Sequence, residues 1–147
     1  MKSMDKDLFF NIHKCNFLFD REVANIVASN KAHQGSQGFL MSVIYEQQMK
    51  NNLVHQKDLE KKLGIRKSSI TQLLNLLEKD GSIIRVNKSG DLRQKCIILT
   101  EEGLKETASI KKQLDEISMK YAKDLSEEEL DVFERVITKI IKKLEEN

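Results

Sequence analysis

Small hydroxyl and amide side chains gather on one side of the segment between Lys67 and Asp80. Its apolar residues repeat at helical spacing and form the other side. That apolar face consists of Ile70, Leu73, Leu74 and Leu77. The polar face presents Ser68, Ser69, Thr71, Gln72, Asn75 and Lys79. Hydroxyl and amide groups can pair with base edges in a major groove, which is wide enough to admit a helix. An ordinary amphipathic surface helix has the same pattern, so this segment alone leaves both interpretations open.

Cationic side chains stand beside this face. Arg66 and Lys67 lie at the helix start, where the helix dipole also favours a phosphate. The loop from Asn87 to Lys95 holds three cations, and an arginine on such a projection can enter a narrow, electronegative minor groove. Asp91 lies two residues before Arg93 and can orient its guanidinium through a salt bridge. The candidate DNA-binding residues are Arg66, Lys67, Ser68, Ser69, Thr71, Gln72, Asn75, Lys88, Asp91, Arg93 and Lys95.

The elements around these residues form a recognisable arrangement. A helix is predicted over 56–63 and another over 67–80, each followed by a glycine, Gly64 or Gly81, that suits a helix C-terminus. The link of three residues between them is typical of a helix-turn-helix. The β-branched runs 83–86 and 96–99 then predict a hairpin whose strands cover the helical core.

Further helices are predicted on both sides of this unit. The first spans Lys6 to about Ala32, and a loop containing Gly35 and Gly38 precedes a second helix from Phe39. Thr100 and Ser126 are expected to cap two C-terminal helices. The last helix has a long apolar stripe of Leu130, Phe133, Ile137, Ile140 and Leu144. This stripe either packs on its own domain or forms a seam with a second chain, and we favour the second interpretation because twofold oligomers are common.

These features together resemble the multiple-antibiotic-resistance regulator (MarR) family. The matching stretches are 56–65, 67–71, 76–81, the Asp91-Leu92-Arg93 wing and 99–103. The resemblance implies a mainly α (α+β) fold, a winged helix-turn-helix with a two-stranded wing and flanking dimerisation helices. It divides the chain into an N-terminal dimerisation helix (1–34), a DNA-binding domain (35–100) and C-terminal dimerisation helices (101–147).

The resemblance also implies a function. Such a chain is expected to be a homodimer that binds pseudo-palindromic double-stranded DNA as a transcriptional regulator. The expected action is repression, released by a small-molecule inducer or an oxidant. Two positions depart from the family pattern, because Arg66 replaces a capping Asp or Ser and Gln72 replaces a frequent Arg. The first departure weakens a helix cap, and the second weakens a phosphate or base contact.

Composition and charge agree with this interpretation. The net charge of the 147 residues is +2, but residues 50–95 hold eleven Lys or Arg against five Asp or Glu. A basic middle between acidic flanks is expected of a module that binds a polyanion. No apolar run is long enough to span a bilayer and no signal sequence is evident, so a cytoplasmic location is expected. No catalytic motif, cofactor motif or metal-ligand spacing is present, and an enzyme is not expected. The alternative is a winged helix that docks a partner protein and does not bind DNA.

The two cysteines differ in context. Cys15 lies on the apolar stripe of the first helix, near the place where oxidant-sensing members of the family carry a reactive cysteine. It is therefore a possible redox sensor, although the stripe favours a small buried hydrophobic residue. Cys96, within a predicted strand, is expected to serve packing alone.

Overall fold

The computed structural model describes residues 7–29, 35–87 and 95–147. Within these residues the chain forms six helices and two strands, and the elements follow in a mainly helical order. They are α1 (Leu8–Ser29), α2 (Gly35–Met49), α3 (Gln56–Leu63), α4 (Lys67–Lys79), β1 (Ile83–Val86), β2 (Cys96–Leu99), α5 (Glu101–Ala122) and α6 (Glu127–Glu145). The predicted bounds of α3 and of both strands are confirmed, and α4 ends one residue earlier than expected.

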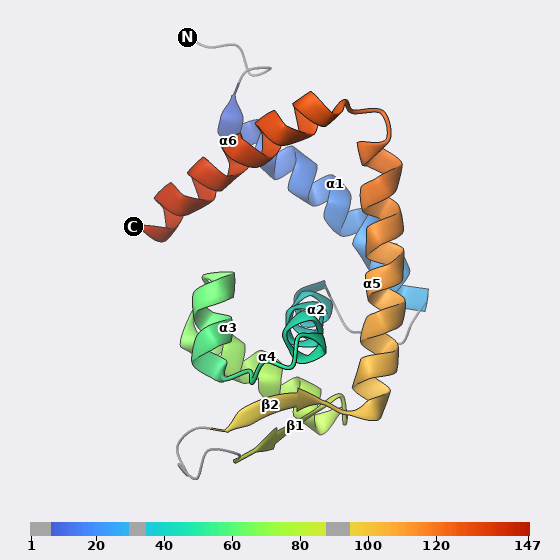
Figure 1. The fold of residues 1–147 in the computed structure, drawn as a ribbon, viewed down its shortest axis with the longest axis vertical. Coiled ribbons are helices and arrows are strands. Elements are labelled where there is room, and N and C mark those ends of the chain that lie inside the picture. Colours follow the sequence, from blue (N-terminus) through green and yellow to red (C-terminus); the bar gives the residue numbers. More distant parts are fainter. Residues whose placement is uncertain (1–6, 30–34, 88–94) are drawn as a thin grey trace.

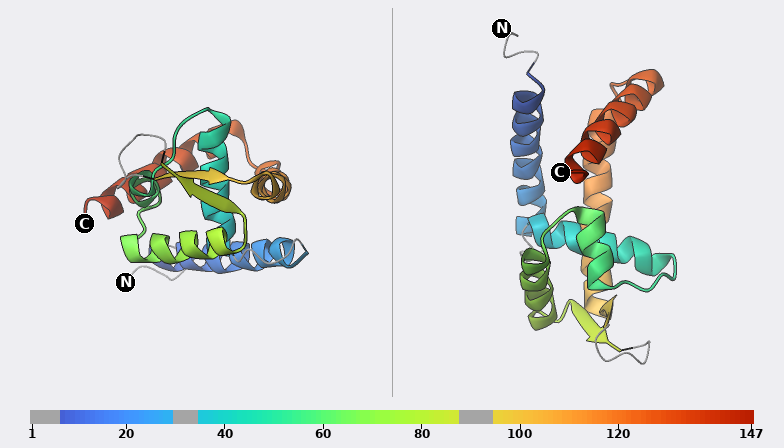
Figure 2. Two further views of the ribbon diagram at one scale, coloured as in Figure 1. Left: turned by 90° about the horizontal axis from the view of Figure 1, so that it is seen from below. Right: turned by 90° about the vertical axis from the view of Figure 1, so that its left-hand side faces the viewer.

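One compact unit, here called the winged lobe, comprises the described residues from 35 to 100. Its helices α2, α3 and α4 surround an apolar core that β1 and β2 close from one side (Figures 1 and 2). The core residues are Leu40, Met41, Val43, Ile44, Val54, Leu59, Ile70, Leu74, Leu77, Ile83, Ile97 and Leu99. The expectation that the two strands cover the helix-turn-helix core is therefore confirmed.

Two glycines shape the helix-turn-helix. Gly64 ends α3 with φ 61°, and Gly81 follows α4 with φ 78°. Both values lie in the left-handed region, which glycine adopts without the steric cost that a Cβ brings. These residues turn the chain sharply, so α4 crosses α3 and then leads directly into β1.

The prediction of a loop around Gly35 and Gly38 is wrong. Helix α2 begins at Gly35, and Gly38 is buried within it. Each glycine lowers helix propensity by about 1 kcal/mol relative to alanine. The same helix buries Leu40, Met41 and Ile44 in the core, and this burial outweighs the local cost. Tertiary packing thus decides the start of α2.

The hairpin pairs its strands in antiparallel register, from Ile83 opposite Leu99 to Val86 opposite Cys96. Beyond the hairpin, Ile97 N donates to Val54 O at 2.8 Å, which ties β2 to the segment before α3. Cys96 is wholly buried, as expected of a packing residue. The wing therefore starts from a base that is fixed on both sides.

Helix α5 begins where the winged lobe ends. Thr100 is its N-cap, and Thr100 Oγ1 accepts from Gly103 N at 3.1 Å, which confirms the predicted cap. Gly103 faces the turn after α4, where a Cβ would lie 2.1 Å from Ser82 O. The helix backbone can approach this carbonyl only because no side chain intervenes.

Beyond the lobe the helices are largely exposed. The stripe on α5 is buried at Ile110, partly buried at Leu114 and Ile117, and 44% exposed at Tyr121. Helix α6 starts with the predicted capping box, in which Ser126 and Glu129 bond each other's backbone N–H, but none of its residues is buried. Figure 1 shows the start of α1, the far half of α5 and α6 standing away from the winged lobe, whereas the other end of α1 lies near α2. No helix among the described residues has the length and apolar character needed to cross a membrane.

Candidate nucleic-acid interface

The outer face of α4 is open to solvent. Arg66, Lys67, Ser68, Ser69, Gln72 and Asn75 are all exposed. The opposite face of the helix is buried at Ile70, Leu74 and Leu77, and Leu73 is partly buried. The predicted division of α4 into a core side and a polar side is therefore confirmed, and the sequence-predicted polar residues of this helix share one surface.

Thr71 lies at the border of this surface. Its hydroxyl donates to Lys67 O and accepts from Gln56 Nε2, both at 2.8 Å. These bonds link the start of α4 to the start of α3 and engage the hydroxyl inside the winged lobe. Thr71 thus has a structural role that the sequence did not indicate, in addition to its predicted place at the interface.

The start of α4 has no side-chain cap. Arg66 occupies the N-cap position in an extended conformation, and its side chain makes no capping hydrogen bond. The predicted loss of a cap at this position is therefore confirmed. The first backbone N–H groups of an uncapped helix point outward with a partial positive charge, which suits an anion such as phosphate.

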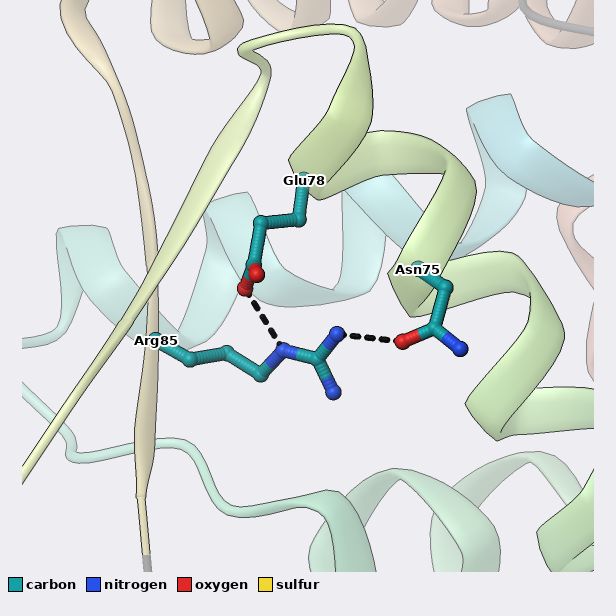
Figure 3. A network of polar contacts seen from close by, with 3 residues as sticks. All are labelled: Asn75, Glu78 and Arg85. Atoms are coloured by element: carbon teal, nitrogen blue, oxygen red, sulfur yellow. Dashed lines mark hydrogen bonds and ion pairs between the residues drawn. The ribbon is translucent and has the colours of Figure 1, made fainter.

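Arg85 connects the hairpin to α4. Its Nε donates to Glu78 Oε2 at 2.7 Å, and its Nη2 donates to Asn75 Oδ1 (Figure 3). The Arg85 side chain is only 22% exposed, so the ion pair lies partly out of water. Neither Arg85 nor Glu78 was among the sequence-predicted site residues. Strand alternation was the available signal, because Arg85 is two residues after the buried Ile83 and so points toward the helix.

A hollow of about 570 Å³ opens beside this network, between α3, α4 and the sheet. Its lining is mostly polar and holds four cations against two acids: His55, Gln56, Lys57, Asp58, Glu60, Lys67, Arg85, Lys95 and Ile97. The structure therefore brings Lys67 and Lys95, both predicted from sequence, to one cation-rich surface. Lys88, Asp91 and Arg93 lie outside the described residues, and their roles stay predictions.

A second hollow, of about 770 Å³, separates the winged lobe from α1 and α5. Asn16 and Asp20 of α1 contribute polar groups to it, whereas Leu73 and Leu76 of α4 contribute apolar surface. The polar face of α4 and this hollow thus lie on adjacent sides of one helix, because Leu76 comes four residues after Gln72. A molecule in the hollow would contact α4 beside its polar face.

Cys15 lies at a third hollow, formed by α1 and α5. The expectation that Cys15 is buried in an apolar stripe is wrong within one chain, because the thiol-bearing residue is exposed. The hollow also contains Phe19, Glu22 and Tyr121. The Tyr121 hydroxyl donates to Glu22 Oε1, and this hydrogen bond raises the pKa of Tyr121 above its ordinary value of 10.0. A phenol therefore borders the same hollow as the cysteine, which sequence spacing alone did not show.

The chain thus has the architecture of a winged helix-turn-helix protein with added helices at both ends. The sequence profile of the MarR family matches residues 41–94. The predicted resemblance and fold class are confirmed. No curated protein matches the chain in sequence.

Solved structures of MarR-family proteins share the fold over nearly the whole chain. The complex of S. aureus MepR with DNA has a TM-score of 0.86 at 22% identity, covering 97% of this chain and 99% of that one. A Listeria monocytogenes protein assigned to the MarR family of transcriptional regulators, in complex with 26mer DNA, has a TM-score of 0.84 at 20% identity, with coverages of 96% and 91%. NadR in complex with 4-hydroxyphenylacetate has a TM-score of 0.74 at 20% identity, with coverages of 95% and 96%.

Proposed function

We propose that this chain is a sequence-specific DNA-binding transcriptional regulator that acts as a homodimer. The observation that carries the proposal is the exposed polar face of α4 beside a cation-lined base of the wing. Ser68, Ser69 and Gln72 lie on this face, with Lys67 and Lys95 at its edge. Two proteins of the same fold, MepR and the Listeria protein, are seen with DNA bound. We therefore assign direct base contacts to α4 and phosphate or minor-groove contacts to the wing.

A second copy of the chain is needed to complete the proposed DNA-binding surface. The apolar stripe of α6 is unburied in one chain, and Phe9 and Phe17 of α1 are more than 70% exposed. A partner chain that covers these helices would place two copies of α4 about one helical turn apart on DNA, roughly 34 Å. A palindromic operator would then match the twofold symmetry of the protein.

Salt dependence tests the DNA-binding proposal. Binding of the purified chain to duplex DNA should weaken steeply between 50 and 200 mM salt, by about a thousandfold for some six phosphate contacts, because each neutralised phosphate releases a counterion. Fluorescence anisotropy with labelled duplex measures this loss. Selection of bound sequences from random duplexes should then yield a palindrome. A chain that ignores every duplex at 50 mM salt would instead be a protein-interaction module.

Two variants test the contributions of α4 and of the wing to DNA binding separately. Gln72→Ala should relax the preference at one or two operator positions by about 1–3 kcal/mol if Gln72 makes a bidentate base contact. Arg93→Ala should weaken binding to the operator while the melting temperature stays unchanged. Unaltered preference in the first variant, or unaltered affinity in the second, removes that residue from the mechanism.

Regulation by a small ligand is the second part of the proposal. The hollow between α1, α2, α4 and α5 has a size that suits a small organic molecule. NadR, of the same fold, binds 4-hydroxyphenylacetate. Ala24 lines the hollow, and Ala24→Trp should fill it. A panel of aromatic compounds that includes 4-hydroxyphenylacetate should contain one that raises the melting temperature of the parent chain but not of this variant. A ligand that stabilises both proteins equally binds elsewhere.

Release by an oxidant is the other form of regulation that the exposed Cys15 supports. Dilute peroxide should then release the parent protein from its operator, whereas Cys15→Ser should remain bound. Cys96→Ser serves as the matched control, because Cys96 is buried and should not be oxidised. Continued binding of the parent protein in peroxide would end the proposal for this thiol.

A further inference from the structure

Asn75 belongs to two rows of side chains on α4. Ser68, Gln72, Asn75 and Lys79 are spaced by four, three and four residues and form the outermost row. Thr71, Asn75 and Glu78 form the adjacent row, which faces α3 and the hairpin through the bonds of Thr71 and Glu78. Asn75 is itself exposed. It can therefore contact the hairpin with one atom and an outside partner with the other.

The identity of the atom that faces the hairpin follows from chemistry. Arginine has only hydrogen-bond donors, so the group of Asn75 that meets Arg85 Nη2 must be the acceptor Oδ1. The amide nitrogen then points the other way, as Figure 3 shows. Within the described residues, Nδ2 has no hydrogen-bond partner. Its two N–H groups are available to an acceptor outside the chain.

Arg85 is itself held in place. Its Nε is paired with Glu78 Oε2 at 2.7 Å, three residues after Asn75 on the same helix. Two side chains of α4, Asn75 and Glu78, therefore accept hydrogen bonds from the guanidinium of Arg85 on β1. This two-point attachment stops the guanidinium from swinging away, and an amide bonded to it keeps one orientation.

We infer that Arg85 is a positioning residue that turns the amide of Asn75 so that its donor, Nδ2, faces the DNA. This inference rests on the proposed DNA-binding function and assigns the chemistry of one contact within it. An unconstrained asparagine reads adenine by using its oxygen and its nitrogen together. With Oδ1 turned to Arg85, Nδ2 of Asn75 pairs instead with an acceptor: N7 of adenine or guanine, O6 of guanine, O4 of thymine, or a phosphate oxygen.

Substitution of Asn75 tests the donor assignment. Asn75→Asp keeps the shape and an acceptor for Arg85, but replaces the donor by a carboxylate oxygen. It should lower affinity for the selected operator by about tenfold or more, and by more than Asn75→Ala does, because it adds repulsion to the lost bond. Both variants should keep the melting temperature of the parent. A loss that depends on the base at one operator position indicates a base contact, and an equal loss on every sequence indicates a phosphate contact.

Substitution of Arg85 tests the positioning. Arg85→Met keeps the stem of the side chain and removes the donors, which releases the amide. If Asn75 contacts a base, the base preference at that operator position should be lost. If it contacts a phosphate, the affinity for every sequence should fall. In an Asn75→Ala background, Arg85→Met should add no further change to that contact, since Arg85 acts there through Asn75. Glu78→Gln is the matched control: it removes the charge beside Arg85 but keeps an oxygen that accepts from Arg85 Nε, so the guanidinium stays in place and the preference should stay intact.

The outcomes separate this inference from the proposed function. A parent protein that binds its operator while Asn75→Asp binds equally well overturns the donor assignment alone. An effect of Arg85→Met that is the same with and without Asn75 overturns the positioning role alone. A parent protein that binds no duplex overturns the proposed function and this inference with it.

Discussion

The winged lobe and the helices at the two ends of the chain carry apolar residues at the same helical spacing, but the lobe buries these side chains and the end helices leave them exposed. In α4, Ile70, Leu74 and Leu77 are wholly buried. In α6, Phe133 is 63% exposed and Leu144 is 66% exposed. Full burial of one such side chain is worth about 1.5–3 kcal/mol. The lobe gains this stabilisation within one chain, whereas the apolar stripe of α6 stays exposed and would gain it only in the proposed homodimer. Periodicity therefore identifies the apolar face of a helix without identifying the molecule that covers it.

The largest effect is expected in the core of the lobe. Leu74→Ala should lower the free energy of unfolding by about 2–5 kcal/mol, because it removes a fully buried side chain and leaves a cavity. Urea unfolding monitored by circular dichroism measures this loss. Val132→Ala, on the exposed surface of α6 at 43% exposure, is the matched control and should change stability far less. Equal losses would mean that the two regions do not differ in packing.

A charge in the α6 stripe should separate the chains. Phe133→Glu should raise the dissociation constant of the homodimer by about thirtyfold or more, as expected for a buried aromatic anchor worth at least about 2 kcal/mol. Sedimentation velocity over a concentration series measures the shift. Lys139→Glu introduces the same charge on the same helix but off the stripe, and should remain dimeric. A monomeric parent protein, or a dimeric Phe133→Glu variant, would contradict the assignment of α6 to the seam.

The joint between the two regions should be sensitive to a single methyl group. Gly103→Ala places a Cβ against Ser82 O, so α5 has to shift away from the lobe, at a cost of about 1–3 kcal/mol. Gly81→Ala is the comparison, because its φ of 78° is unfavourable for alanine, unlike that of the helical Gly103, but nothing lies within 4 Å of the added Cβ. Thermal unfolding should therefore show a larger loss for Gly103→Ala. The reverse order would mean that backbone strain matters more at this joint than close contact.

The smallest expected effect concerns an ion pair between the lobe and α5. Lys111 Nζ lies 3.0 Å from Glu46 Oε1. Their hydrogen bond lowers the pKa of Glu46 below 4.5 and raises the pKa of Lys111 above 10.5. The contribution of the pair is complete between these two values. It is lost as pH falls through the lowered pKa of Glu46, or rises through the raised pKa of Lys111.

The exposure of both groups keeps this contribution small. A double-mutant cycle of Glu46→Gln and Lys111→Met should give a coupling of about 0.5 kcal/mol at pH 7, as is usual for exposed pairs. The coupling should vanish below the pKa of Glu46. Urea unfolding at pH 7 and at a series of lower pH values provides the measurement. A coupling that stays unchanged while Glu46 becomes protonated would show that the contact is not ionic.

Local signals predicted most of the fold. Gly64 and Gly81 fixed the ends of two helices, Thr100 and Ser126 fixed the starts of two others, and the change to β-branched residues located both strands. These signals act within a few residues, so a sequence displays them directly. The start of α2 could not be predicted in this way, because burial of Leu40 and Ile44 outweighs the glycines around it.

The candidate site was predicted in outline only. The exposed row on α4 follows from helical periodicity, and Ser68, Gln72 and Asn75 do lie on it. The bonds of Asn75 to Arg85 and of Thr71 to Gln56 depend on how separate elements pack, over ten and fifteen residues of sequence. The exposure of Cys15 likewise depends on the helices that surround it. Such contacts arise from three-dimensional arrangement, and no spacing rule encodes them. The division of the chain at residues 34 and 100 stays a prediction.

Helix α5 is a long connection between the winged lobe and α6, so a small tilt at one end becomes a large displacement at the other. With 22 residues at about 1.5 Å each, it is about 33 Å long. Its near end is pressed against Ser82, and its far end leads into α6 (Figure 1). A rotation of only about five degrees about the near end displaces the far end by about 3 Å, close to the rise of one base along a DNA strand. In the proposed homodimer, a ligand that tilts α5 by this amount would move the two copies of α4 out of register with their operator.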